Sequence, residues 1–204
     1  MIQNLFSMTG KICLVTGGSS GLGSYMAAGF LAAGAERVFI TGRSEDKLSK
    51  KADELSALSE GQCIPIPGDL SDLEGVQALA EAISERESHL DVLVNNAGLG
   101  LGTQIQTMTA KAWDKSMDLN TRSPLFLTQA LLELLKAKAT LDDPSRIIFI
   151  SSVAASGVLP SVLAYSTSKK ALEHLTPSLA LALTDDFIRV NAIAPGRFYS
   201  EMTR

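Results

Sequence analysis

Short apolar runs alternate with longer stretches of helical periodicity along this chain. The runs lie at 12–16, 37–41, 63–66, 91–95, 146–150 and 188–193, and most are continuously apolar rather than alternating. That pattern is typical of strands covered on both faces of a parallel sheet. Helices are predicted between the runs, at about 21–33, 45–58, 72–87, 109–137 and 163–184. The alternation predicts an α/β domain with a doubly wound parallel sheet.

The third helical stretch shows the clearest amphipathic pattern, in which Leu73, Val76, Leu79, Ala80 and Ile83 follow i, i+3, i+4 spacing. Pro177 interrupts the last stretch, where its missing backbone donor predicts a bend or a break. No repeat, low-complexity tract or linker divides the chain, so residues 1–204 are predicted to form a single domain.

Composition and charge exclude several classes of protein. With 46% hydrophobic and 20% charged residues, the 204-residue chain has a globular profile rather than a disordered or collagen-like one. Its net charge of −4 argues against a non-specific nucleic-acid partner. No apolar run reaches the roughly 18 residues of a membrane helix, and the N-terminus lacks the pattern of a signal peptide. We therefore expect a cytoplasmic protein without a membrane partner.

Cysteine and histidine are too sparse for a disulfide framework or a metal site. Cys13 and Cys63 lie far apart, as do His89 and His174, and none has ligand spacing to another. Both cysteines are interpreted as small core residues. His174 is expected at the surface or an interface, and Trp113 is expected to pack at the start of a long helix or to border a substrate entrance.

A glycine-rich turn follows the first apolar run. In the segment 16–23, Gly17, Gly21 and Gly23 have the spacing of a phosphate-binding turn. Glycine allows positive φ and close backbone approach, while the following helix points its positive end at an anion. An ordinary tight turn is the alternative, which the strand before and the helix after disfavour. The predicted pyrophosphate contacts are Gly17, Ser19, Ser20, Gly21, Leu22 and Gly23.

The end of the second run indicates which dinucleotide would bind. Dinucleotide folds usually place an acidic residue about 20 residues after the glycines, to hold the ribose 2′-hydroxyl. Here Gly42 occupies that position and Arg43 follows it. Because a guanidinium suits a 2′-phosphate, the pattern favours NADP(H) over NAD(H). A solvated surface role for Arg43 is the alternative.

Polar residues after the third and fourth runs extend the candidate cofactor site. Asp69, followed by Leu70, is placed to accept a hydrogen bond from the adenine amino group, although a helix cap or loop role is nearly as well supported. The segment 95–98 has two asparagines that can tie strand ends together. Asn96, Ala97 and Gly98 would then line the cofactor edge, unless the segment is a bare turn.

A candidate catalytic group follows the fifth run. Tyr165 and Lys169 are four residues apart and so share one face of a helix. An ammonium beside a phenol favours the phenolate, which makes tyrosine an acid or base near neutral pH. Ser152 lies just past the fifth run, where its hydroxyl could bond a substrate oxygen. Taken alone, Tyr165 and Lys169 would be interpreted as residues of an exposed helix face. Because Ser152, the glycine-rich turn and the segment 95–98 also occur in the expected order, a chance arrangement is a poor explanation.

These motifs together resemble the short-chain dehydrogenase/reductase family of the common, non-extended type, over nearly the whole chain. The resemblance implies a Rossmann-type fold, with Tyr165 as proton donor and Ser152 as the hydroxyl that polarises the carbonyl. Lys169 would assist Tyr165 and hold the nicotinamide ribose. Asn120 matches the family asparagine that holds a relay water; taken alone, it would be a buried polar residue that satisfies backbone groups.

The resemblance also covers the last residues. Pro195 and Gly196 with Ser200 match the family segment over the nicotinamide, although a plain loop would look the same. Family members continue through a helical region, a seventh strand and a tail, which this sequence lacks. The resemblance further implies a homodimer or homotetramer, with the stretches 109–137 and 163–184 as the expected interface.

The substrate is predicted only by class. The segments 194–203 and 141–146 resemble the rhamnolipid-type 3-oxoacyl reductase branch of the family, which implies a 3-oxoacyl thioester or related ketone. The pocket wall, residues 153–159 with 99–103, is expected to be small and apolar. The alternatives are a polyol, sterol or polyketide ketone, and a catalytically idle NADP(H)-binding subunit.

Overall fold

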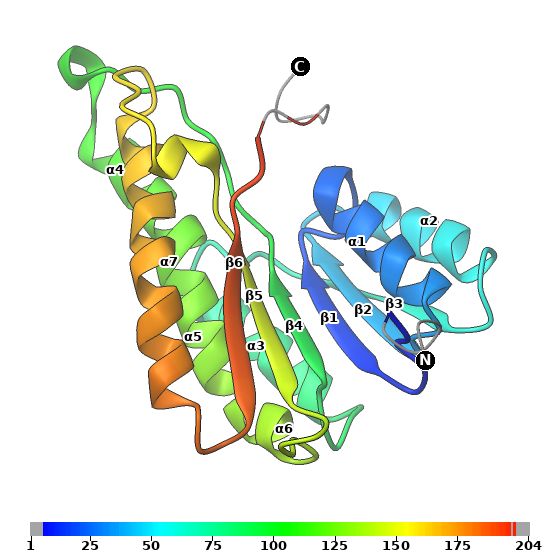
Figure 1. Cartoon of the computed structure of the whole chain (residues 1–204). Helices are drawn as coiled ribbons and strands as arrows, with labels where there is room; N and C mark the ends of the chain where they lie inside the picture. Colours follow the sequence, from blue (N-terminus) through cyan, green and yellow to red (C-terminus); the bar gives the residue numbers. More distant parts are fainter. Residues whose placement is uncertain (1–5, 197, 199–204) are drawn as a thin grey trace.

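The computed structural model describes residues 6–196 and residue 198. Its strands are β1 (Ile12–Thr16), β2 (Arg37–Gly42), β3 (Gln62–Pro67), β4 (Val92–Asn95), β5 (Ser145–Ile150) and β6 (Ile188–Ile193). All pair in parallel in one sheet of order β3-β2-β1-β4-β5-β6 (Figure 1). The predicted doubly wound, Rossmann-type fold is confirmed. Strand order reverses between β1 and β4, and such a switch point opens a crevice at the carboxyl ends of the strands.

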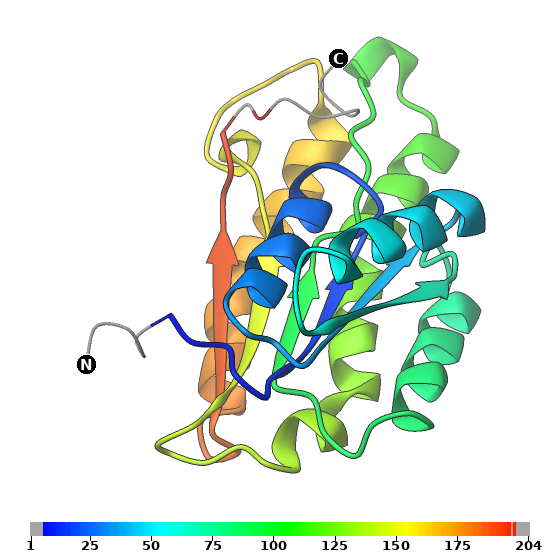
Figure 2. The ribbon, with the colours of Figure 1, turned by 90° about the vertical axis from the view of Figure 1, so that its right-hand side faces the viewer.

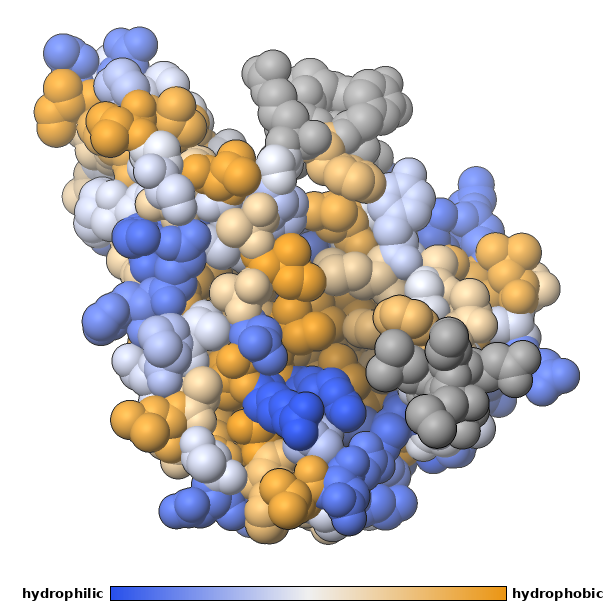
Figure 3. Space-filling model, viewed as in Figure 1, coloured by the Kyte–Doolittle hydropathy of each residue, from blue (hydrophilic) through white to orange (hydrophobic). Residues whose placement is uncertain are grey.

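Helices cover both faces of the sheet (Figures 1 and 2). The helices α1 (Gly21–Ala32) and α2 (Glu45–Ser56) lie on one face; α3 (Leu73–Ser84), α5 (Ser123–Ala130), α6 (Leu132–Lys136) and α7 (Leu163–Ala182) lie on the other. The sheet separates two hydrophobic cores, one against α1 and α2 and the other against α3, α5, α6 and α7. In β1, Cys13 and Val15 belong to the first core, whereas Leu14 belongs to the second. β6 is the edge strand of the described sheet, and Figure 3 shows apolar residues along this side.

The single helix predicted over 109–137 is wrong, since this stretch is divided. It contains α4 (Ala110–Met117), a π-helical segment η3 (Asp118–Arg122), α5 and α6. Pro124 gives a physical reason, because its nitrogen carries no hydrogen for the carbonyl of Asn120, its α-helical partner. The backbone N–H of Ser123 bonds instead to Asp118, one residue further back.

A break at Pro177 is also wrong, because α7 continues through it as one helix. Pro177 lies on the exposed side of α7, where water can satisfy the carbonyl that loses its donor. Leu175 and Leu179, on either side of Pro177, pack against the core between the sheet and α3–α7, and this packing stabilises the helix across the proline. No helix among residues 6–196 is long and apolar enough to cross a membrane.

Candidate active site

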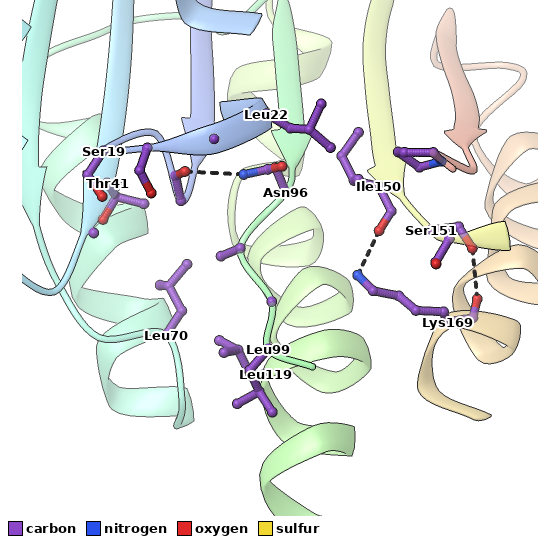
Figure 4. A pocket seen from close by; sticks show the side chains of 18 of the residues that line it. Ser19, Leu22, Thr41, Leu70, Asn96, Leu99, Leu119, Ile150, Ser151 and Lys169 are labelled. Carbon is purple, nitrogen blue, oxygen red and sulfur yellow. Dashed lines mark hydrogen bonds between the residues drawn. The ribbon is translucent and has the colours of Figure 1, made fainter. Parts of the chain in front are cut away.

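A cavity of about 350 Å³ lies at the carboxyl ends of the strands (Figure 4). It brings together predicted residues from every strand end and from α7. These are Gly17, Ser19, Ser20, Gly21, Leu22, Arg43, Asp69, Leu70, Asn96, Ala97, Gly98, Ser152, Tyr165, Lys169, Pro195 and Gly196. Two predicted residues, Gly23 and Asn120, do not line it, and Ser200 lies outside the described residues.

The glycine turn leaves a space that side chains at the glycine positions would fill. Gly17 and Gly21 have φ of +67° and +55°, which other residues rarely adopt. A Cβ on Gly23 would lie 2.2 Å from the carbonyl oxygen of Gly17, so this glycine permits close packing of α1 on the turn rather than contact with a ligand. Ser20, at the N-cap of α1, forms no side-chain cap, which leaves first-turn N–H groups for an anion. The turn therefore fits a diphosphate.

Asn96 ties the end of β4 to the turn. Its Nδ2 donates to the carbonyl oxygens of Thr16 at 2.8 Å and Gly17 at 3.2 Å, while Thr16 Oγ1 accepts from the backbone N–H groups of Asn96 and Ala97, both at 2.9 Å (Figure 4). The predicted tie between strand ends is confirmed and the bare turn is wrong. This network fixes the separation of the walls on which a cofactor would lie.

At the end of β2 the cavity is lined by a glycine and an arginine, and not by a carboxylate. Gly42 and Arg43 both line it, Arg43 is exposed, and within the described part of the chain Arg43 forms no ion pair. Asp69 accepts from the backbone N–H of Ser71 at 3.0 Å, whereas Asp72 is the residue that caps α3. Asp69 is thus a loop residue on the cavity wall, and the helix-cap alternative is wrong.

Lys169 is buried beside Tyr165. Its side chain comes from α7, its Nζ donates to the carbonyl of Ile150 at 2.7 Å, and Nζ lies 5.9 Å from the centre of the Tyr165 ring (Figure 4). Burial lowers the pKa of Lys169 from its usual 10.5 to about 8, because charge is disfavoured away from water. The structure therefore places an amine with a lowered pKa beside the Tyr165 ring on the cavity wall.

Ser152 lies two residues after β5 and on the same cavity. Its Oγ accepts from the backbone N–H of Ala154 at 3.2 Å, which caps the short turn η4 (Val153–Ala155). This bond fixes the oxygen and leaves the hydroxyl hydrogen for another acceptor. The arrangement can donate a hydrogen bond to a substrate oxygen.

Asn120 is fully buried behind the cavity. Its Oδ1 accepts from the backbone N–H of Leu99 at 2.8 Å, and its Nδ2 donates to Leu99 O and to Ser168 Oγ, both at 3.0 Å. The side chain thus satisfies backbone groups, as its plain interpretation predicted. Its main-chain carbonyl is the one that Pro124 deprives of an α-helical donor.

Sequence reasoning missed several wall residues. Thr41, Gly68, Ile150 and Ser151 lie at or directly after strand ends, and that position was the signal available, whereas Leu119 lies in η3 and Phe198 lies beyond β6. Of the expected pocket wall, residues 99–103 and 153–159, Leu99 is the one residue that lines this cavity in the described part of the chain. Ser168 was also missed, although it lies between Tyr165 and Lys169. Its Oγ accepts from Asn120 and donates to the Tyr165 carbonyl at 2.7 Å.

The remaining candidates lie away from the cavity. Cys13 and Cys63 are buried core thiols, as predicted, and desolvation raises the pKa of each to about 12. His174 is exposed on α7, and Trp113 is partly exposed on α4. No cluster of three metal-ligating side chains occurs among the described residues.

A glycine turn at the switch point, with serine, tyrosine and lysine on one cavity, defines a dinucleotide-dependent α/β oxidoreductase architecture. The short chain dehydrogenase family model matches residues 11–204, and the chain belongs to this family. It is 46% identical over 200 residues to the rhamnolipids biosynthesis 3-oxoacyl-[acyl-carrier-protein] reductase of Pseudomonas aeruginosa, covering 98% of this chain and 77% of that protein.

Solved structures agree with this assignment. The Pseudomonas aeruginosa RhlG/NADP active-site complex superposes with a TM-score of 0.93 at 44% identity, covering 98% of this chain and 77% of that one. The L-sorbose reductase of Gluconobacter frateurii, complexed with NADPH and L-sorbose, superposes with a TM-score of 0.91 at 29% identity, covering 96% and 73%.

Proposed function

We propose that this protein is an NADP(H)-dependent oxidoreductase that transfers a hydride between the nicotinamide and a carbonyl or secondary alcohol. The observation that carries the proposal is that Ser152, Tyr165 and Lys169 line the same cavity as the glycine turn. A protein that only bound the nucleotide would need the turn but not the proton donor.

The proposed cofactor contacts are the predicted residues that line the cavity: Gly17, Ser19, Ser20, Gly21, Leu22, Asp69, Leu70, Asn96, Ala97 and Gly98, with Pro195 and Gly196 toward the nicotinamide. Ser200, a further predicted contact, lies outside the described residues. Gly42 and Arg43 favour the 2′-phosphate, because no carboxylate repels it and a guanidinium can pair with it. The NADP and NADPH complexes of the two similar structures support this choice.

Side chains of this protein carry out the proton transfer to the substrate. Tyr165 gives its hydroxyl proton to the substrate oxygen as the carbonyl is reduced, while Ser152 donates a hydrogen bond to the same oxygen. Lys169 stabilises the tyrosinate and holds the ribose, and Asn120 positions the loop at Leu99. The bound nicotinamide supplies the hydride chemistry, and the protein supplies orientation and electrostatics.

The substrate we propose is a 3-oxoacyl thioester or related ketone. The similarity to the reductase from Pseudomonas aeruginosa supports it. A polyol ketone is the second candidate, favoured by the similarity to L-sorbose reductase. We also propose a homodimer or homotetramer that uses the α4–α5 and α7 surfaces, and a cytoplasmic location.

Turnover on a substrate panel tests the proposal. NADPH oxidation is followed with 3-oxoacyl thioesters, simple ketones and ketoses, alongside a fluorescence titration of NADPH binding. Turnover that disappears in the Tyr165→Phe variant supports the oxidoreductase. NADPH binding without turnover of any compound contradicts it and leaves an idle binding subunit.

A further inference from the structure

A buried serine at the start of α5 contacts the loop that follows β3. Ser123 is 3% exposed, and its Oγ donates a hydrogen bond to the carbonyl oxygen of Leu70. Hydroxyl groups on helices usually donate to a carbonyl of their own helix one turn earlier, as Ser84 does to Ala80. Ser123 instead joins two elements whose residues lie 53 positions apart in the sequence.

The junction of η3 and α5 contacts two different walls of the cavity. One contact goes to α7, where the carbonyl of Ser168 accepts a hydrogen bond from Thr121 Oγ1 at 3.0 Å. The other is the bond from Ser123 to the loop of residues 68–72, here called the β3 loop. The junction therefore supports both the helix that carries Tyr165 and the loop that carries the proposed adenine contacts.

The peptide group between Asp69 and Leu70 is held at both ends. A Cβ on Gly75, in the first turn of α3, would collide with the carbonyl oxygen of Asp69, so this oxygen packs directly on the glycine. The next carbonyl, that of Leu70, is held by Ser123. Because a trans peptide is planar, fixing the Asp69 carbonyl also fixes the Leu70 N–H, which points the opposite way.

The β3 loop offers a donor and an acceptor next to each other on the cavity wall. The Leu70 N–H has no hydrogen-bond partner in the described part of the chain, and one oxygen of the Asp69 carboxylate remains beside the one that Ser71 N uses. Both residues line the cavity, and Leu70 is labelled in Figure 4. Adenine presents the complementary pair, an amino group that donates beside a ring nitrogen that accepts.

We infer that Ser123 is a positioning residue for recognition of the adenine base. By holding the Leu70 carbonyl, it keeps the β3 loop where the Asp69 carboxylate and the Leu70 N–H can bind adenine together. This inference rests on the proposed function, because it requires NADP(H) in the cavity. A base with the reverse pattern should bind poorly. Hypoxanthine is such a base, since it carries an oxygen in place of the amino group and a hydrogen on the adjacent ring nitrogen.

The test compares NADPH with its hypoxanthine analogue, reduced nicotinamide hypoxanthine dinucleotide phosphate. Both carry the same fluorescent dihydronicotinamide, so one fluorescence titration measures both dissociation constants without turnover. We expect the unaltered protein to bind NADPH about tenfold or more tightly, because the analogue leaves polar groups of the wall unpaired. In Ser123→Ala the loop loses its support at Leu70, and this preference should fall by about threefold or more. A preference that the variant retains overturns the inference.

Ser145→Ala is the matched control. Ser145 is 4% exposed, and its Oγ donates to the carbonyls of Leu135 at 2.6 Å and Leu90 at 3.3 Å. It is the first residue of β5, at the end of the strands opposite the cavity (Figure 1). Its replacement removes a buried bond of the same kind and should lower stability in urea titrations to a similar extent, while the base preference stays unchanged. An equal fall in both variants would show that the preference follows stability alone, and overturns the inference.

A second variant covers the case in which Ser123→Ala does not fold. Ser123→Cys keeps nearly the same size but is a weak donor, so its base preference should also fall. Failure of the proposed function is distinguishable. If the unaltered protein binds neither dinucleotide, the cofactor assignment and the inference are both overturned. If it binds both equally, the cofactor assignment stands and the inference alone is overturned. Absence of turnover does not affect the titration.

Discussion

The side-chain amide of Asn120 lies 3.0 Å from the hydroxyl of Ser168, which itself donates to the carbonyl of Tyr165 at 2.7 Å. Both side chains are fully buried. The π-helical segment, the loop at Leu99 and the turn of α7 that carries Tyr165 are therefore joined by one chain of hydrogen bonds. Such a buried network is stable only while every member keeps its partners.

Replacing Ser168 by Ala should damage this network. Asn120 Nδ2 loses one acceptor in a site without water access, so the free energy of unfolding should fall by about 1–3 kcal/mol in urea titrations. We also expect kcat to fall more than KM rises, because Tyr165 and Asn120 lose their relative position. Ser166→Ala is the control. Among the described residues, the Ser166 hydroxyl donates to the carbonyls of Val162 and Leu163 at the start of α7, and its loss should be nearly neutral. Equal effects of the two variants would contradict the network.

Gly23→Ala should disrupt the phosphate turn. The new Cβ would lie 2.2 Å from Gly17 O and 2.6 Å from Asn96 Nδ2, so the turn must shift. We expect a loss of about 2 kcal/mol or more in stability, together with weaker NADPH binding. Gly29→Ala on the same helix meets nothing within 4 Å and should stabilise the protein by about 0.5–1 kcal/mol. Thermal unfolding and NADPH titration of both variants check whether Gly23→Ala lowers the stability while Gly29→Ala raises it.

The strands and the cavity residues at their ends could be predicted because each strand is marked by an apolar run within a few neighbouring residues. Each of the six strands lies within one residue of its apolar run, since a continuous run buried on both faces has few other places in an α/β domain. Strand ends then located the cavity, because the carboxyl ends of parallel strands share one edge.

The division of the 109–137 helix could not be read from its apolar pattern, because the pattern continues through it. Only Pro124, whose nitrogen carries no hydrogen, marks the change in the sequence. Ser168 escaped prediction because its partner Asn120 lies 48 residues away in the sequence, and only the fold brings the two side chains together.

Gly42→Asp should move cofactor preference from NADPH toward NADH. A carboxylate at the end of β2 repels the 2′-phosphate and can accept from a ribose 2′-hydroxyl. The backbone allows the change, because a Cβ there meets nothing nearer than Ser19 Oγ at 3.3 Å. The ratio of dissociation constants for the two cofactors is the measurement. Equal affinities for NADPH and NADH in the unaltered protein would contradict the role given to Gly42 and Arg43.

The buried ammonium of Lys169 should make stability depend on pH. Its pKa is about 8 in the folded chain and 10.5 when exposed, so between these values the unfolded state binds more protons. The free energy of unfolding should therefore rise with pH across this window, as the cost of burying the charge disappears. In Lys169→Met this rise should be absent, and the difference between the two proteins in urea titrations isolates it. A difference that stays constant from pH 7 to pH 11 would show that Lys169 keeps an ordinary pKa.

Tyr165→Phe is expected to remove catalysis and spare cofactor binding. The ring and its packing remain, but the variant lacks the hydroxyl that protonates the substrate oxygen, so turnover should fall by about 10²–10⁴-fold. NADPH affinity should barely change, because the glycine turn and the Lys169 ammonium are intact. Lys169→Ala is the informative comparison. The proposal gives its ammonium two roles, at the phenol and at the ribose, so its loss should weaken turnover and binding together. Parallel assays of NADPH oxidation and NADPH titration separate the two variants. Near-normal turnover in Tyr165→Phe would show that Tyr165 is not the proton donor, and would remove the main support for the proposed oxidoreductase function.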